Sequence, residues 1–281
     1  MDHTHSHADA DTSQLADLLD LDAEALPSYL AEVSEWVREL APARPIRRIL
    51  DLGAGTGVGS VALAQGFPDA DVIAVDGSPE MLSRLNHKAT ELGLAARIGT
   101  VEADLDVTWP AIEPVDIVWA SMSLHHLADP DRVLEQVFTS LRPGGLVVAL
   151  EMTAPLRFLP DDIGTGRPGL EERCHAALAQ ERAAALPHLG ADWGPRLERA
   201  GFTSVVGRTF EIDVKPAGSG AAGRHARGFF QRMRPAVESR LDPADRAVLD
   251  SLLDSAGPDS LLHRTDLHLH GTRPAWAAHR R

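Results

Sequence analysis

Apolar residues recur at helical spacing near the start of the chain. Between Leu15 and Leu40 they return every three or four residues, and the pattern is interrupted once, at Pro27. Proline is tolerated in the first turn of a helix, because the amide hydrogen that it lacks has no partner there. We therefore expect two helices that end near Pro42. Residues 1–13 are polar and show no periodicity, so we expect them to form a disordered tail.

From Ile46 onward, short apolar runs alternate with helical stretches. The runs lie at residues 48–52, 72–76, 98–101, 115–119, 146–150, 203–214 and 266–279. Such alternation predicts βαβ units around a parallel sheet that is buried on both faces. Residues 142–145 predict a tight turn before the fifth strand. Gly271 and Pro274 predict a bulge or an edge break in the last strand.

Two segments after the fifth strand are too long for ordinary connections. They cover about residues 156–190 and 216–262, and we expect both to be helical lid insertions. The domain organisation that follows is a tail at 1–13, a helical cap at 14–45 and one α/β domain at 46–281 that includes both lids.

Composition and charge exclude several classes of function. The chain has 281 residues, 44% of them hydrophobic, which suits one large domain. Its 41 acidic residues outnumber 27 basic ones, and the net charge of -14 repels a phosphate backbone, so we expect no nucleic-acid partner. The single cysteine, Cys174, allows no disulfide within the chain. Neither a secretory signal nor an apolar run of membrane length is visible. We expect a soluble, cytoplasmic protein without a membrane partner, and the sequence leaves its oligomeric state open, a homodimer included.

The strongest local motif is a strand that runs into a glycine-rich turn and then into a helix. Gly53, Gly55 and Gly57 follow the first apolar run directly. Glycines there permit a tight turn and let a ligand lie against bare backbone amides. A nicotinamide dinucleotide would require a glycine three residues after Gly55, where this chain has Val58. A dinucleotide is therefore disfavoured.

With these residues the chain resembles the class I S-adenosylmethionine-dependent methyltransferases. Their first motif, acidic-x-Gly-x-Gly-x-Gly, is matched by Asp51 and the three glycines, and further matches follow in order. These are Asp76 after the second strand, 103–105 after the third, 121–126 after the fourth and 141–145 before the fifth. The resemblance is close over residues 46–151. It implies a Rossmann-like sheet of seven strands, with helices on both faces and an antiparallel last strand.

The resemblance also implies S-adenosylmethionine as the cofactor. An acid at the end of the second strand, Asp76, can accept hydrogen bonds from a ribose diol; the alternative is a helix cap, which Ser78 serves better. Asp104 would accept from the adenine amine, or else be a solvated turn residue. The candidate cofactor-binding residues are Tyr29, Asp51, Gly53, Ala54, Gly55, Thr56, Gly57, Asp76, Gly77, Ser78, Met81, Ala103, Asp104, Leu105, Ser121 and His126. For Tyr29 and Met81 a plain packing role is the alternative.

Methyl transfer from a sulfonium is an in-line displacement, which needs a base only where the acceptor must lose a proton. His126 and Glu151 are the candidate catalytic residues, because they follow the fourth and fifth strands at the sheet edge where ligands of such folds bind. A helix-start role for His126 and a solvated position for Glu151 are the alternatives. The histidines at positions 3, 5 and 7 could hold a metal, but a flexible tail would not fix them, and we predict no metal site.

The predicted function is methyl transfer to O, N or C of a small-molecule acceptor, with a secondary metabolite as one option. Two alternatives stay open. The first is an enzyme that binds S-adenosylmethionine without methylating, such as a cyclase. The second is a non-catalytic binding partner that uses the site as a sensor.

Overall fold

The computed structural model describes residues 3–215 and 220–281, with side chains from residue 12 onward. The chain divides into two compact units. We call the first the helical unit; it comprises Met1–Pro27, Pro155–Pro187 and Glu211–Gly271. We call the second the sheet unit; it comprises Ser28–Ala154, His188–Phe210 and Thr272–Arg281.

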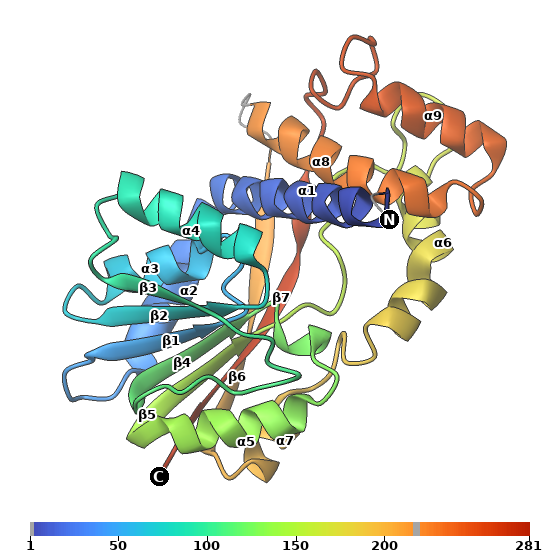
Figure 1. Ribbon diagram of the computed structural model, residues 1–281. Helices are drawn as coiled ribbons and strands as arrows, with labels where there is room; N and C mark the ends of the chain where they lie inside the picture. Colours follow the sequence, from blue (N-terminus) through green and yellow to red (C-terminus); the bar gives the residue numbers. More distant parts are fainter. Residues whose placement is uncertain (1–2, 216–219) are drawn as a thin grey trace. The chain divides into compact units, whose positions relative to one another are not determined.

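Seven strands form one sheet in the order β3-β2-β1-β4-β5-β7-β6 (Figure 1). The strands are β1 (Arg48–Leu52), β2 (Asp71–Asp76), β3 (Ile98–Glu102), β4 (Val115–Ser121), β5 (Leu141–Leu150), β6 (Thr203–Val214) and β7 (Leu269–His279). β1 pairs in parallel with β2 and β4, whereas β7 runs antiparallel to β5. The expected mostly parallel, seven-stranded sheet is thereby confirmed, including its antiparallel last strand.

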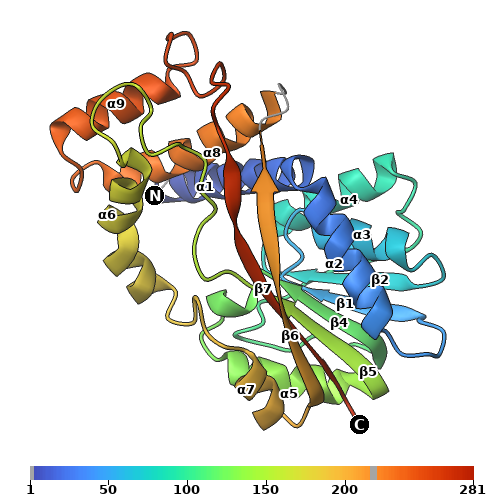
Figure 2. The same ribbon diagram turned by 180° about the vertical axis from the view of Figure 1, so that it is seen from behind.

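Helices cover both faces of this sheet. Those of the sheet unit are α2 (Pro27–Leu40), α3 (Val58–Gly66), α4 (Pro79–Glu91), η1 (Leu124–His126), α5 (Pro130–Ser140) and α7 (Gly194–Arg199). Trp36 of α2, Leu63 of α3 and Leu85 of α4 are buried in the core of one face. Figure 2 shows these three helices beside β1 and β2. Val133 of α5 and Leu197 of α7 are buried in the core of the other. The strands are apolar on both sides because both of their faces are covered.

The start of β5 differs from the expected tight turn at residues 142–145. β5 already begins at Leu141, which is paired with Val115, and the register then shifts so that Leu146 pairs with Ile117. Pro143 has no amide hydrogen to donate to a ladder, and Gly144 has a φ of 75°. The four residues thus form an irregularity inside β5, and the expectation that the strand begins only after them is wrong.

The tail expected at residues 1–13 is also wrong from His3 onward, because α1 (His3–Ala25) begins there. Once the apolar residues after Leu15 nucleate a helix, each added residue costs little. Pro27 opens α2, as predicted. The expected cap at 14–45 is thus two helices, of which α1 belongs to the helical unit and most of α2 to the sheet unit. The side chains of His3, His5 and His7, and with them the metal alternative, lie outside the described residues.

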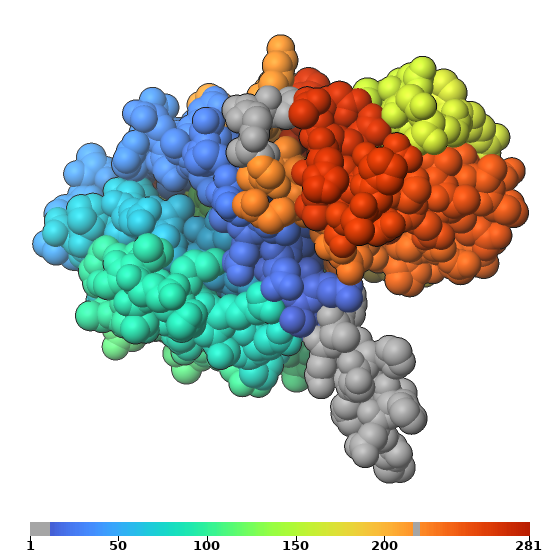
Figure 3. Space-filling model, turned by 90° about the horizontal axis from the view of Figure 1, so that it is seen from above, coloured from blue at the N-terminus to red at the C-terminus, as the bar shows by residue number. Residues whose placement is uncertain are grey.

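The helical unit combines α1 with helices from both expected insertions. These helices are α6 (Leu170–Ala185), α8 (Gly220–Val237) and α9 (Pro243–Leu253). α1 lies along α8 (Figures 1 and 2), where Asp22 contacts His225 at 2.6 Å and Glu24 contacts Arg224 at 2.6 Å. The segment after α9, drawn in red in Figure 3, lies beside the start of α8. In the described part of the chain, no helix has the length and apolar content needed to cross a membrane.

Candidate active site

The glycine loop between β1 and α3 has a conformation that other residues rarely adopt. Gly53, Gly55 and Gly57 have φ values of 67°, 53° and 84°. The Gly53 and Ala54 amides donate to the Val75 carbonyl oxygen at 2.8 and 3.0 Å, which fastens the loop to β2. A Cβ at Gly53 would lie 2.4 Å from the Ser123 Cβ. The loop therefore depends on glycine both for its backbone angles and for the close approach of the segment after β4.

Asp76 ends β2 and lies directly against this loop. Its Oδ2 accepts from the Gly55 amide at 2.8 Å, and its Oδ1 accepts from the Ser78 amide at 2.8 Å. A carboxylate offers about four lone-pair sites, so two acceptor sites are left for a diol. Ser78 itself caps α4, since its hydroxyl accepts from the Met81 amide at 3.3 Å. The residue chosen as the better cap is confirmed in that role.

Asp51 is buried under the same loop, near the carboxyl end of β1. Its Oδ2 accepts from the Ser60 hydroxyl of α3 at 2.6 Å. Burial raises the pKa of Asp51 to about 7, and the neighbouring charge of Asp76 adds to the rise, while the Ser60 hydrogen bond opposes it. Near neutral pH this carboxyl group is poised between its two charge states. A cationic ligand group close to it would favour the carboxylate.

Other predicted cofactor residues follow the loop and the next two strands. Thr56 is buried, and its carbonyl oxygen accepts from Lys88 of α4 at 3.0 Å. Met81 is also buried. Gly77 is exposed and leads from β2 to the cap of α4. Tyr29 of α2 packs edge-on against Phe210, with ring centroids 5.9 Å apart, which matches its alternative packing role.

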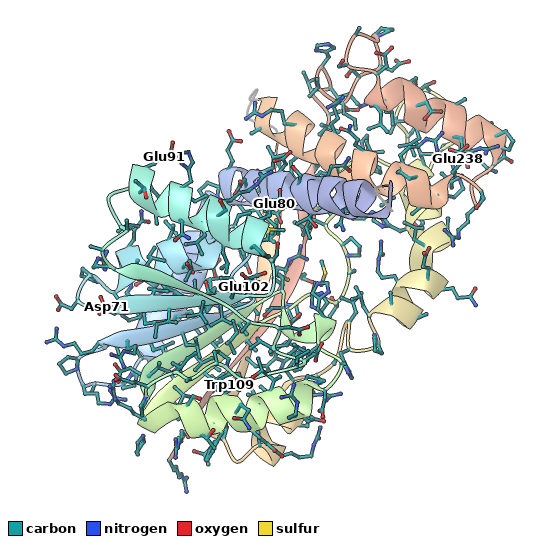
Figure 4. All side chains as sticks on the ribbon, in the orientation of Figure 1. Asp71, Glu80, Glu91, Glu102, Trp109 and Glu238 are labelled. Atoms are coloured by element: carbon teal, nitrogen blue, oxygen red, sulfur yellow. The ribbon has the colours of Figure 1, made fainter. Side chains whose placement is uncertain are left out.

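The segment after β3 returns towards β2 and then forms a long loop. The Ala103 amide donates to the Asp76 carbonyl oxygen at 3.0 Å. Asp104 is exposed, and its Oδ1 accepts from the Asp106 amide at 2.9 Å, while the Leu105 carbonyl oxygen accepts from Arg132. Further along, Trp109, labelled in Figure 4, donates to the Ser140 hydroxyl of α5 at 3.1 Å. The loop is thus held at both ends, with the Asp104 side chain left accessible.

The segment after β4 carries the histidine pair. Ser121 ends the strand, and Met122 has a φ of 54°, which bends the chain sharply. The Ser123 hydroxyl then donates to the Leu52 carbonyl oxygen at 2.8 Å, across the start of the glycine loop. The segment is therefore fixed to the same loop that Asp76 and Val75 hold.

The structure brings Glu151 together with His125 rather than with His126. The Glu151 Oε1 accepts from the Leu124 amide at 2.9 Å, and its Oε2 is paired with the Nδ1 of His125. Both side chains are buried, at 3% exposure for His125 and 2% for Glu151. His126 is exposed, and its ring lies 4.2 Å from that of His125, centroid to centroid.

The sequence interpretation missed His125 as the buried partner. Adjacent residues in a 3-10 turn point about a third of a turn apart, so sequence order alone does not tell which of two histidines faces the core. Glu151, directly after β5, is the feature of the sequence that indicates a partner for one of these histidines. It lies 26 residues further along the chain, and only the pairing of β4 with β5 brings it close.

Comparisons with known proteins find methyltransferases. A family model described as a methyltransferase domain matches residues 49–145. Trans-aconitate 2-methyltransferase of Methylobacterium radiotolerans is 30% identical over 62% of this chain and 61% of its own length. Demethylmenaquinone methyltransferase of Thermus thermophilus is 34% identical over 51% of this chain and 64% of its own length. The chain thus spans about three fifths of the length of these curated relatives.

The fold has counterparts among solved structures. Phosphoethanolamine N-methyltransferase 2 of Haemonchus contortus, solved with S-adenosylhomocysteine, superimposes with a TM-score of 0.51 at 16% identity. The superposition covers 87% of this chain and 51% of the other. At this identity the likeness shows a shared fold.

Proposed function

We propose that this chain, which contains a class I S-adenosylmethionine-dependent methyltransferase domain, transfers the methyl group of that cofactor to a small molecule. The observation that carries the proposal is the junction of the glycine loop with Asp76. Three glycines at alternate positions, each with a positive φ, leave the backbone bare there, and a carboxylate with open acceptor sites is hydrogen-bonded into the loop. Both features lie within the residues that match the methyltransferase domain.

The residues of this chain fit the cofactor group by group. Asp76 would hold the ribose diol, and Asp104, which is exposed, would accept from the adenine amine beside the Leu105 amide. Asp51 would favour the ammonium of the methionine part, because a buried carboxyl group with a raised pKa gains from a nearby cation. The backbone of residues 53–57, with Gly77, Ser78, Met81, Ala103, Ser121, His126 and Tyr29, would complete the site.

The bound cofactor supplies a methyl group on a positively charged sulfur, and the protein supplies alignment and exclusion of water. Where the acceptor must lose a proton, His126 is the residue we propose to take it, since its ring is exposed. Glu151 is buried with both oxygens engaged, so we assign it a positioning role. It orients His125, whose ring packs against His126.

The acceptor is a small molecule methylated at O, N or C. The named substrates of the two relatives, trans-aconitate and demethylmenaquinone, differ in chemistry, so they do not single out one acceptor class. The matched domain ends at residue 145, before either insertion. We propose that residues of the insertions choose the acceptor, and that the reaction takes place in the cytoplasm, where a lone buried thiol such as Cys174 persists.

The first test is calorimetric titration of the full chain with S-adenosylmethionine and S-adenosylhomocysteine. We expect both to bind. Asp76→Ala should weaken binding by roughly 2–4 kcal/mol, through loss of hydrogen bonds to the diol and of the loop anchor. Asp71→Ala is the matched control, because Asp71 begins the same strand at the opposite edge of the sheet and is exposed (Figure 4). Absence of binding to folded protein would refute the proposal.

The second test separates methyl transfer from the alternatives. Transfer of a labelled methyl group is measured on a panel of phenols, amines and carboxylic acids. Incorporation into an acceptor supports the proposal. Binding of the cofactor without transfer to any member of the panel would favour a cyclase-like enzyme or a sensor.

A further inference from the structure

The indole of Trp119 lies beside Asp51, on the face of the sheet that α3 covers. Asp51 of β1 and Trp119 of β4 are direct neighbours in the parallel register. Directly paired residues of adjacent strands point to the same face of a sheet, and Trp119 belongs to the same buried core as Leu63 of α3. Ser60, also on α3, donates to the Asp51 carboxyl group. Both side chains therefore point from the sheet towards α3.

Gly59, near the start of α3, lets these two side chains approach the helix backbone closely. Its φ is not positive, so the backbone angles do not require glycine, and alanine would favour a helix more. A Cβ at this position would lie 2.7 Å from the Trp119 Nε1 and 3.2 Å from the Asp51 Oδ2. Since these two distances share one end point, the nitrogen and the oxygen are at most about 6 Å apart. The missing side chain of Gly59 thus leaves space beside both polar atoms.

The indole N–H of Trp119 is a buried donor without an acceptor. Trp119 is 4% exposed, and its Nε1 has no hydrogen-bond partner among the described residues. An indole nitrogen can only donate, and a buried donor that donates to nothing destabilises the folded protein. The fold therefore keeps an unused donor close to a carboxyl group.

Asp51 in turn lacks donors for its charged form. Its donors come from Ser60, and desolvation raises the pKa of Asp51 more than these hydrogen bonds lower it. The charge of Asp76 on β2 raises that pKa further, and α3 has no charged residue that could offset it. A hydrogen bond to a charged oxygen is about twice as strong as one between neutral groups, so the indole gains most when Asp51 is a carboxylate.

We propose that Trp119 is a positioning residue of the cofactor site. Its indole N–H donates to the Asp51 carboxylate when the ammonium of the methionine part lies beside Asp51, and Gly59 leaves room for that hydrogen bond. The ammonium keeps Asp51 in its charged form, which accepts from the indole more strongly. The indole in return stabilises the carboxylate, and binding of the ammonium becomes tighter. The inference rests on the proposed function, because it requires the cofactor beside Asp51.

The first test follows the indole N–H signals of the full, isotope-labelled chain by proton–nitrogen correlation NMR. The five tryptophans give five such signals, and Trp119→Phe identifies one of them by its loss. We expect saturating S-adenosylhomocysteine to move this signal to higher proton frequency, as a new hydrogen bond does. Methylthioadenosine has the adenosine part without the ammonium, and at saturation it should leave the signal in place.

Trp193 is the matched control for this measurement. Its Nε1 is also buried without a partner in the described part of the chain, but it lies in the core of the opposite face of the sheet. Trp193→Phe identifies its signal in the same way. That signal should move with neither ligand.

The second test measures affinity by calorimetric titration of the same samples. Trp119→Phe should weaken S-adenosylhomocysteine about tenfold and leave methylthioadenosine unchanged, whereas Trp193→Phe should change neither. Gly59→Ala should also weaken S-adenosylhomocysteine selectively, because the added carbon would contact both the donor and the acceptor. Gly66→Ala, at the end of the same helix with nothing within 4 Å of the added atom, is its control. A tryptophan that only packs would weaken both ligands alike.

Three results would each overturn the proposal: a Trp119 signal that stays in place while S-adenosylhomocysteine binds, an equal movement with methylthioadenosine, or an equal loss of affinity for both ligands in Trp119→Phe. If Trp119→Phe does not fold, the nuclear Overhauser contact of the indole hydrogen with the Gly59 α-hydrogens identifies the signal in the unaltered protein, and the comparison of the two ligands still decides. Binding without movement of the signal overturns this inference alone. Absence of S-adenosylhomocysteine binding to folded protein overturns the proposed function as well.

Discussion

Asp116 and Asp51 are buried carboxylates on neighbouring strands, but they lie near opposite ends of the sheet. Asp116, at the start of β4, accepts from the backbone amides of Arg47 and Arg48 at 2.7 and 3.0 Å. It also pairs with the side chains of Arg44 and Arg142. Burial would raise its pKa, but these partners outweigh burial and hold the pKa at about 2. Asp51, near the end of β1, has one hydroxyl partner and a pKa of about 7.

The amino ends of β1 and β4, where Asp116 lies, stabilise the fold, whereas the carboxyl ends, where Asp51 lies, suit a ligand. We call these the stabilising end and the binding end of the sheet. Saturating a buried carboxylate with four donors makes its charge favourable to folding. Asp51 has only one donor residue, Ser60, so its negative charge is unfavourable unless a cation binds beside it. Ligands of open parallel sheets bind at the carboxyl ends of the strands, which is where Asp51 lies. The poorly stabilised carboxylate of Asp51 therefore lies where a positively charged ligand group could stabilise it.

The largest effect should come from Asp116→Ala. It leaves two arginines and two amides without their acceptor, and breaking such a buried pair costs about 3–5 kcal/mol in the free energy of unfolding. Urea unfolding at pH 7 measures the loss. Glu113→Gln, which removes an exposed partner of Arg48, is the control and should produce no measurable change. A loss no greater than that of the control would mean that the amino end does not stabilise the fold in this way.

The same residue predicts a pH dependence. Because the pKa of Asp116 falls from 3.8 to about 2 on folding, its charge stabilises the protein above pH 4. That contribution should disappear as the pH falls from 4 through 2. In Asp116→Ala the free energy of unfolding, measured in urea at a series of pH values, should depend less on pH below 4. An unchanged dependence would contradict the assignment.

At the binding end, Gly53→Ala should come next. The new Cβ would lie 2.4 Å from the Ser123 Cβ at a φ of 67°, so both overpacking and backbone strain apply, about 2–4 kcal/mol together. Thermal unfolding and titration with S-adenosylmethionine should both show the loss. Gly66→Ala is the control, since nothing lies within 4 Å of the added atom. Adding Ser123→Gly to Gly53→Ala should recover part of the stability, and failure to do so would exclude the clash as the cause.

The binding end could largely be predicted from the sequence, and the stabilising end could not. Gly53 and Asp76 lie in short motifs next to apolar runs, so their positions relative to a strand could be inferred. Asp116 lies inside such a run, and its partners Arg44 and Arg142 are 72 and 26 residues away. The pairing of His125 with Glu151 was missed for a related reason, because it depends on the pairing of β4 with β5.

Asp51→Asn should change stability in the opposite sense to Asp116→Ala. Folding raises the pKa of Asp51 from 3.8 to about 7, so the native state binds the extra proton and loses stability as the pH rises from 4 through 7. A rise of about three pKa units corresponds to about 4 kcal/mol, and a neutral amide removes this cost. The amide must itself be buried with few partners, so we expect a net gain of roughly 2 kcal/mol at pH 8 and none at pH 4. Urea unfolding across this range measures it. Affinity for S-adenosylmethionine should fall in the same variant. A stability loss at pH 8 would show that the folded protein stabilises the Asp51 carboxylate more than its single hydrogen-bonding partner indicates.

The smallest effect should come from Glu151→Gln, which tests whether Glu151 at the binding end orients His125 and, through it, His126. The amide can still accept from the Leu124 amide, but its nitrogen forces His125 to present an acceptor, so the two rings lose their fixed orientation. We expect kcat to fall about tenfold, or 1.4 kcal/mol, with KM for S-adenosylmethionine nearly unchanged and the pH profile of kcat displaced. Glu135→Gln, on the exposed side of α5, is the control. A purely structural role would instead lower stability and leave the pH profile of kcat in place, so the profile distinguishes the two.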